Sequence, residues 1–145
     1  MKPKTMYRVV LSDSYNGLAF VHSDNRMFTN ANDAISAADE HISRKIETIP
    51  GSIKVTIPGA RYTSFVMLDN VECLTCAVWP VVFDGNTVTY RDFEFVCKES
   101  GLAVSLLDNE MATCVDINDA LMFVDSFILS STIQVKMMER MIGNQ

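Results

Sequence analysis

Three dipeptides that favour tight turns divide residues 1–90, and each lies between two segments rich in β-branched and aromatic side chains. They are Asn16-Gly17, Pro58-Gly59 and Asp84-Gly85. Asn, Asp and Gly tolerate the positive φ of hairpin turns, whereas Pro presets the first turn position. The sequence therefore predicts three β-hairpins, which pair residues 6–12 with 18–22, residues 53–57 with 62–68, and residues 71–83 with 87–90.

Two of the predicted strands carry further information. Ile53, Val55 and Ile57 alternate with polar residues, which is the period of a half-buried strand. Pro80 interrupts the long first strand of the third hairpin. Because proline has no backbone N–H to donate, we expect an edge position or a bulge at that point.

Two segments show the three- and four-residue spacing of apolar side chains that is typical of a helix. The first spans residues 30–48, starts with an asparagine that suits the N-cap, and ends at Pro50-Gly51. The second spans residues 116–142, either as one helix or as two that break at residues 130–132.

A shorter helix over residues 92–100 and a strand over residues 103–107 complete the expected order. That order is hairpin, helix, two hairpins, short helix, strand and long helix. It lacks the βαβ alternation of a dinucleotide-binding sheet. We therefore expect a single α+β domain over residues 1–145, with a mostly antiparallel sheet built from hairpins and packed by two or three helices.

The distribution of charge bears on the choice of partner. The formal net charge is −6, and all of it comes from residues 51–145, which hold six basic and twelve acidic side chains. Nucleic-acid binding needs clustered Lys and Arg, so we expect no nucleic-acid partner. An acidic surface suits a protein partner with a basic surface, and it also serves simply to keep a protein in solution.

The N-terminal segment bears on localisation. Lys2 and Lys4 are followed by neither the apolar core nor the cleavage site of a signal peptide. No apolar run approaches the roughly 18 residues that span a bilayer. We expect a cytoplasmic protein of the producing or host cell, with no membrane partner.

The cysteines and the acidic loops are the candidate metal ligands. Cys73 and Cys76 form a C-x-x-C pair whose flanks are typical of a strand, with no Gly or Pro to form a zinc knuckle. The acids that follow Asp116 lack the glycine and the final glutamate of a calcium loop. We expect no metal and no cofactor, and four cysteines that serve as small apolar side chains, while zinc at the C-x-x-C pair stays open as the alternative.

The two histidines are candidates for general-base chemistry. His22 with Asp24, or His41 with a nearby Asp, would suit that role. No activated nucleophile, phosphate-binding loop or G-x-S-x-G motif accompanies them. A hydrolase that uses His22 or His41 with a carboxylate therefore ranks third among the functions considered, and no catalytic residue is assigned.

The C-terminal segment is apolar on more than one side. One stripe contains Leu121, Val124, Ile128, Val135, Met138 and Ile142, and a second contains Ala120, Phe123, Phe127, Met137 and Met141. One domain face normally uses a single stripe. Two stripes indicate either a homodimer through this helix or a helix buried centrally in its own domain.

The function expected first is a small binding protein that acts by protein–protein contact, such as an inhibitor or accessory factor of the phage or mobile-element type. The expected contact residues are Asp108, Glu110, Asp116, Asp119, Phe127, Met137, Met138 and Met141. The alternative is a module that sequesters or senses a small molecule, because curved sheets backed by helices often hold one. Its expected ligand-binding residues are Tyr62, Phe65, Trp79 and Tyr90.

Overall fold

The fold is one antiparallel sheet with two helices. A computed structural model describes residues 2–15, 18–59 and 61–143. In chain order the elements are β1 (Lys4–Tyr15), β2 (Leu18–Phe28), α1 (Ala31–Thr48), β3 (Ile53–Ile57), β4 (Thr63–Leu68), β5 (Val71–Asp84), β6 (Thr87–Tyr90), β7 (Phe93–Lys98), β8 (Gly101–Leu106), β9 (Asn109–Cys114) and α2 (Ile117–Gly143). Every strand pairing described is antiparallel. The predicted α+β class is confirmed.

Strand β5 lies at the centre of the sheet and forks it. β1 pairs with one edge of β5, from Leu74 to Phe83. The other edge is shared, because β4 pairs with residues 71–77 and β6 with residues 81–84. The edge position predicted at Pro80 is met locally, although β5 is a central strand. Pro80 lies opposite Tyr7 of β1, and on its other side it lies between the residues that pair with β4 and those that pair with β6, where the missing N–H disrupts no described strand pairing.

The three predicted hairpins are confirmed as β1–β2, β3–β4 and β5–β6, although the Asn16-Gly17 turn itself lies outside the described residues. The short helix predicted over residues 92–100 is wrong. Phe93 and Phe95 are both buried and alternate with exposed neighbours, so this segment is strand β7. The strand predicted over residues 103–107 is β8, and β9 was not predicted.

Both long helices form where the sequence predicts them. Asn30 caps α1, and its side chain accepts a hydrogen bond of 2.8 Å from the backbone N–H of Asp33. α2 is one continuous helix, and the hydroxyls of Ser131 and Thr132 donate to carbonyls four residues earlier rather than breaking it. Within the described part of the chain, neither helix is long and apolar enough to cross a membrane.

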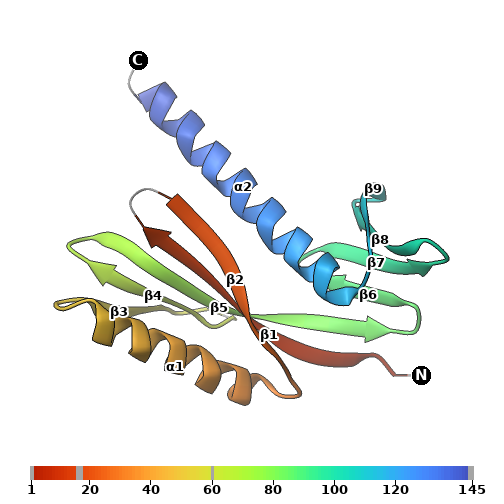
Figure 1. The fold of residues 1–145 in the computed structure, drawn as a ribbon, viewed down its shortest axis with the longest axis horizontal. Coiled ribbons are helices and arrows are strands. Elements are labelled where there is room, and N and C mark those ends of the chain that lie inside the picture. The colour runs from red at the N-terminus through yellow and green to blue at the C-terminus, as the bar shows by residue number, and fades with distance from the viewer. Residues whose placement is uncertain (1, 16–17, 60, 144–145) are drawn as a thin grey trace.

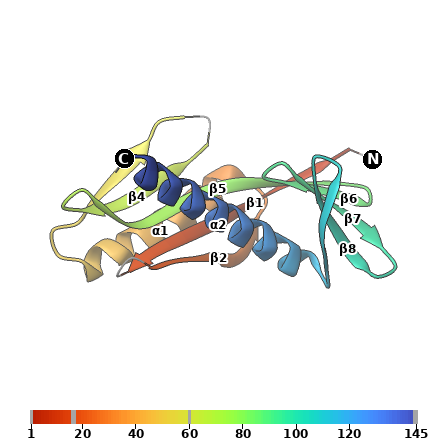
Figure 2. The ribbon, with the colours of Figure 1, turned by 90° about the horizontal axis from the view of Figure 1, so that it is seen from above.

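The two helices lie on opposite faces of the sheet (Figures 1 and 2). The neighbouring residues Val9 and Val10 of β1 show why, because side chains of a strand alternate between faces. Val9 belongs to the core under α1, with Ile42 of that helix. Val10 belongs to the core under α2, with Leu121 and Val124. Each helix therefore has a core of its own.

Only the first half of α2 is packed against the sheet. Ala120, Leu121 and Val124 are buried, but Met138 is 60% exposed and Met141 is 69% exposed near the other end. Figure 1 shows the helix rising away from the sheet toward its C-terminus. The sheet face below it is left open.

The open face extends to strand β3 at the edge of the sheet. Ile53, Val55 and Ile57, predicted to be half-buried, are all exposed. α1 covers the opposite face of the sheet, and α2 rises away from this one. Neither of these two described helices therefore covers the three β3 side chains.

Candidate functional site

The carboxylate of Asp125 in α2 is the centre of a buried polar network. Its side chain is 3% exposed. Oδ2 accepts two hydrogen bonds of 3.2 Å from Arg8 of β1. Oδ1 accepts one of 2.6 Å from the Tyr90 hydroxyl and one of 2.9 Å from Arg91. Two guanidinium groups therefore share a single carboxylate, and they tie α2 to two distant parts of the sheet.

The protonation of Tyr90 is fixed by its surroundings. Burial and the neighbouring Asp125 carboxylate hold the pKa of the Tyr90 phenol well above its usual range. The phenol therefore stays protonated and donates its hydrogen bond to Asp125 at all physiological pH values.

Arg91 reaches this network from a strained turn. Arg91 and Asp92 form the two-residue connection between β6 and β7, with φ values of 49° and 71°. A two-residue hairpin of this kind needs positive φ at both positions, which Asn and Gly adopt most easily. For a long side chain such as Arg91 that conformation costs on the order of 1 kcal/mol. From this turn the Arg91 side chain reaches Asp125 and pairs with it at 2.9 Å.

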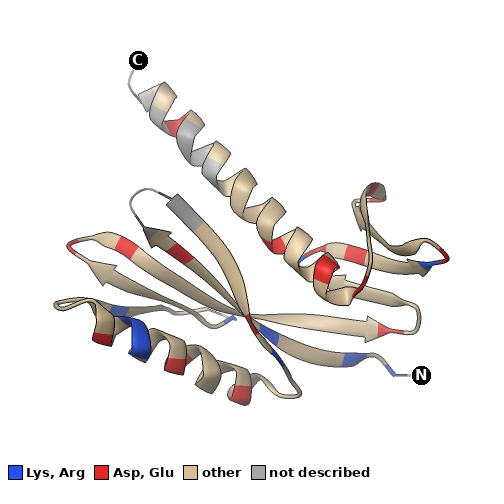
Figure 3. Ribbon diagram, in the orientation of Figure 1, with Lys and Arg blue, Asp and Glu red and all other residues tan. Residues whose placement is uncertain are grey.

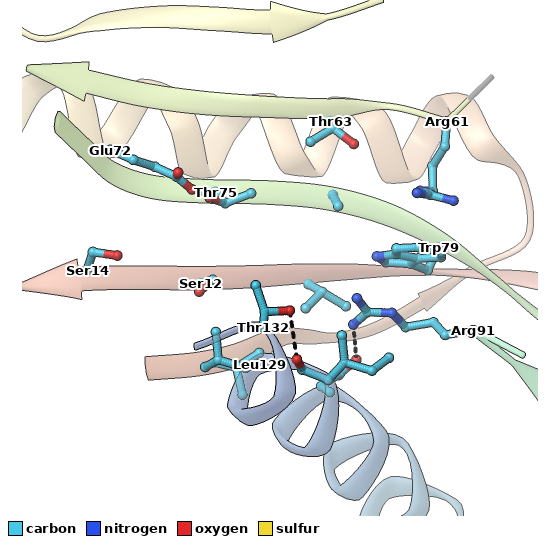
Figure 4. Close-up of a pocket in the computed structure, with 15 residues that line it drawn as sticks. Ser12, Ser14, Arg61, Thr63, Glu72, Thr75, Trp79, Arg91, Leu129 and Thr132 are labelled. Carbon is cyan, nitrogen blue, oxygen red and sulfur yellow. Dashed lines mark hydrogen bonds and ion pairs between the residues drawn. The ribbon is translucent and has the colours of Figure 1, made fainter. Parts of the chain in front are cut away.

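Arg91 and Arg61 lie against the two faces of Trp79, which is the only tryptophan in the sequence. The guanidinium carbon of Arg61 is 3.4 Å from the ring centroid, and that of Arg91 is 4.3 Å from it. Figure 4 shows Arg61 on one side of the indole and Arg91 on the other. Cations in these positions are attracted by the ring electrons. The three side chains form a cationic stack at one end of a hollow.

That hollow, hereafter the groove, lies between α2 and the open face of the sheet and has a volume of about 350 Å³. The register of β1 with β5 builds its floor, since Val10 is opposite Ala77 and Ser12 is opposite Thr75. Hydroxyl groups recur along it, from Ser12, Ser14, Thr63, Thr75 and Thr132. Glu72, which accepts a hydrogen bond from Thr75, lies at the end opposite the cationic stack (Figure 4). The volume is within the range of small-molecule sites.

The four aromatic residues predicted to bind a ligand are dispersed. Trp79 alone lines the groove. Tyr90 is fully buried and supports the groove through Asp125. Tyr62 packs against the core under α1 and donates to Asp39 of that helix, whereas Phe65 is half-buried on β4.

The residues predicted to contact a protein partner do not form one cluster. Asp108, Glu110, Asp116 and Asp119 are all exposed, but they lie at opposite ends of β9. Figure 3 shows acidic positions distributed over the β6–β9 end of the molecule and the start of α2. Phe127 packs edge-on against Phe93 with ring centroids 5.8 Å apart, Met138 and Met141 are exposed, and the side chain of Met137 lies outside the described part of the structure.

Each histidine meets a carboxylate. His22 pairs with Asp13 at 2.7 Å rather than with the predicted Asp24, and its ring is half-exposed. His41 pairs with Asp24 at 2.9 Å, and the hydrogen bonds from Arg26 hold the pKa of the Asp24 carboxyl well below its usual range. Among the hydrogen bonds of the described residues, neither ring contacts a hydroxyl or a thiol.

The cysteines of the C-x-x-C pair have separate surroundings. The thiol of Cys76 is buried and lies 3.8 Å from the carbonyl oxygen of Ala38 in α1. Cys73 lies where the register between β4 and β5 shifts, and its thiol lies 3.7 Å from the carbonyl oxygen of Val71. Among the described residues, no three His, Cys, Asp or Glu side chains gather to hold a metal ion.

Alkylation of the native protein is expected to modify Cys97 first and Cys76 only after unfolding. Burial raises the pKa of the Cys76 thiol to about 12, and the thiolate is the reactive form, whereas Cys97 is exposed. Time-resolved alkylation followed by peptide mass spectrometry measures each site, and the Cys97→Ser variant removes the fast phase. Equal rates at Cys76 and Cys97 would contradict the packing described under α1.

Sequence reasoning missed the residues that matter most here, namely Arg8, Arg61, Arg91 and Asp125. One signal was present in the sequence. Asp125 follows Leu121 by four residues and precedes Ile128 by three, so it lies on the apolar stripe of α2. An acid in that position needs a buried partner. The sequence does not say which basic residue supplies it.

The groove, the Asp125 network and the exposed apolar surface are the features that a functional proposal has to explain. Comparison of the chain with protein-family models, with curated protein sequences and with solved structures finds no match.

Proposed function

We propose that this protein is a non-enzymatic binding module that holds a small molecule in the groove. The observation that carries the proposal is the stack of Arg61, Trp79 and Arg91 at one end of that groove. Two cations and a row of hydroxyl groups converge on a concave site, which is the pattern of a ligand pocket with a few placed polar groups.

The site is also organised in advance. Arg91 is only 14% exposed and is fixed by Asp125, which Arg8 and Tyr90 hold in turn. A group that is already fixed loses little conformational entropy when a ligand binds. The network therefore supports binding rather than only stability, since it keeps a guanidinium group at the wall of the groove.

Native mass spectrometry of the protein isolated from its own cell tests this function. We expect an additional small mass on the folded chain that is lost on mild denaturation. The Ala77→Leu variant fills the floor of the groove and should not retain that mass, whereas Arg44→Ala on the outer surface of α1 should retain it. A folded chain that carries no small molecule, or one whose ligand survives the Ala77→Leu change, would overturn the proposal.

A second candidate function is contact between two copies of this chain, and the projecting half of α2 favours it. Met138, Met141 and Ile142 are exposed at a spacing of three and four residues, so they share one side of the helix. A stripe of this kind is self-complementary when two copies of the helix pair around a two-fold axis. The same contact would leave the acidic residues at the other end of the molecule free for a further protein partner.

Sedimentation velocity over a range of protein concentrations tests this second function. We expect a dimer that the Met138→Glu/Met141→Glu variant dissociates, because the carboxylates would be buried between the helices. Met122→Glu is the matched control, since Met122 is exposed on the packed half of the same helix. A monomer at every concentration would eliminate the contact between copies.

A further inference from the structure

We infer that the groove binds a phosphate monoester with a polyhydroxylated body, with the phosphate held by Arg61 and Arg91. This inference rests on the proposed function and names the ligand chemistry of that same site.

The cationic end of the groove carries an excess of positive charge. At this end Arg61 and Arg91 line the groove and Arg8 lies behind them, bound to Asp125, so the cluster holds three positive charges and one negative charge, an excess of two. Glu72, the other acid that lines the groove, lies at the opposite end (Figure 4). Among the described residues Arg61 forms no ion pair, and the buried Nε of Arg91 has no hydrogen-bond partner. A phosphate monoester carries a charge of about −1.5 to −2 at pH 7, which matches this excess, whereas a carboxylate carries only −1.

The geometry of the stack disfavours a nucleobase as the ligand. Arg61 and Arg91 already occupy the two faces of Trp79, so the indole offers no free face on which a nucleobase could stack (Figure 4). The two guanidinium groups lie on opposite sides of the ring and are separated by its thickness. A phosphate has three terminal oxygens and can accept hydrogen bonds from both groups at once.

The rest of the groove suits a polyhydroxylated body. From Trp79 to Thr75 the floor extends about 13 Å along β5, which is enough for a sugar-sized body attached to a phosphate. Ser12 and Thr63 offer hydroxyl groups that can both donate and accept, as a polyol requires, whereas the Thr132 hydroxyl donates to the Ile128 carbonyl and can only accept. Val10 and Ala77 supply apolar contacts for the C–H groups of such a ring.

Fluorescence of the single tryptophan reports on this site directly, because Trp79 lies within it. The probes are glucose 6-phosphate, ribose 5-phosphate, inorganic phosphate, glucose and gluconate, each compared with sodium chloride at equal ionic strength. We expect saturable changes with both sugar phosphates, binding of inorganic phosphate that is weaker by about tenfold or more, and no saturation with glucose or gluconate. The absence of saturable binding by both sugar phosphates would overturn the inference.

Matched variants locate the binding. Arg61→Ala is expected to weaken the affinity for sugar phosphates by about 10–100-fold, because it removes a charge-assisted hydrogen bond. Arg61 is exposed, so the variant retains its fold, which circular dichroism verifies. Arg44→Ala is expected to leave the affinity unchanged. Equal weakening in both variants would show non-specific charge binding and would refute the phosphate site.

The two proposals fail in different ways. If native mass spectrometry finds a ligand that the Ala77→Leu change removes, but no phosphate probe binds, then the groove is a binding site and the phosphate chemistry is wrong. If no ligand is retained and no probe binds, both the function and its ligand chemistry are wrong.

Discussion

The Asp125→Ala variant is expected to lose about 3–5 kcal/mol of unfolding free energy, because the change leaves two buried guanidinium groups without their shared carboxylate. Arg8 and Arg91 are both largely buried, and the Tyr90 hydroxyl loses its acceptor as well. Breaking a buried pair from one side costs far more than the net contribution of the intact pair. Urea denaturation followed by circular dichroism measures the loss.

Two further variants separate this explanation from a general effect of mutating α2. Ser126→Ala changes the exposed neighbour of Asp125 and is expected to stay within about 0.5 kcal/mol of the parent. Replacing Arg8 and Arg91 with Met together with Asp125→Leu removes all three charges, and it is expected to recover most of the lost stability. A loss below about 1 kcal/mol in Asp125→Ala would show that water solvates this network.

The Gly101→Ala variant is expected to lose about 2–4 kcal/mol of unfolding free energy. Gly101 begins β8 with φ of +131°, a backbone conformation that is accessible essentially to glycine alone. A Cβ atom there would also lie 2.4 Å from the carbonyl oxygen of Cys114 in β9. Because that oxygen belongs to the backbone, β9 itself would have to shift.

Two other glycines serve as controls in the same urea experiment. Gly85 has φ of +62° but no atom within 4 Å of a Cβ, so Gly85→Ala is expected to cost about 1–2 kcal/mol for the conformation alone. Gly59 has neither a positive φ nor an atom within 4 Å of a Cβ, so Gly59→Ala is expected to leave the unfolding free energy nearly unchanged. If Gly101→Ala and Gly85→Ala lose the same unfolding free energy, the close approach of β9 to Gly101 contributes nothing to the loss.

The sequence predicted those parts of the fold that depend on residues close to one another along the chain. A turn dipeptide between β-rich runs suffices for each of the first three hairpins, and the Asn30 side chain needs only the N–H of Asp33 to start α1. The segment 92–100 shows the limit of such signals. Asp92 and Gly101 resemble the start and stop of a helix, but Phe93 and Phe95 gain more by alternating into the core under α2.

The candidate site depends on contacts between distant parts of the chain. Arg8 and Asp125 are separated by 117 positions, and nothing local to either residue names the other. Trp79 was proposed as a ligand contact, but the two arginines that flank it were not, because they follow different strands and converge only in the folded sheet.

Because β5 forks the sheet, the two arginines that flank Trp79 come from different halves of the sheet. Arg61 precedes β4, on one prong of the fork, and Arg91 follows β6, on the other prong. Both prongs meet within a few residues of Trp79, where the N–H of Val78 donates to the Tyr62 carbonyl oxygen at 3.1 Å. A molecule held by both arginines would therefore connect the β4 side of the sheet with the β6 side. These two sides are otherwise joined through strands β1 and β5. Occupancy of the groove would therefore add a direct connection between the two halves of the sheet, besides the one that β1 and β5 provide.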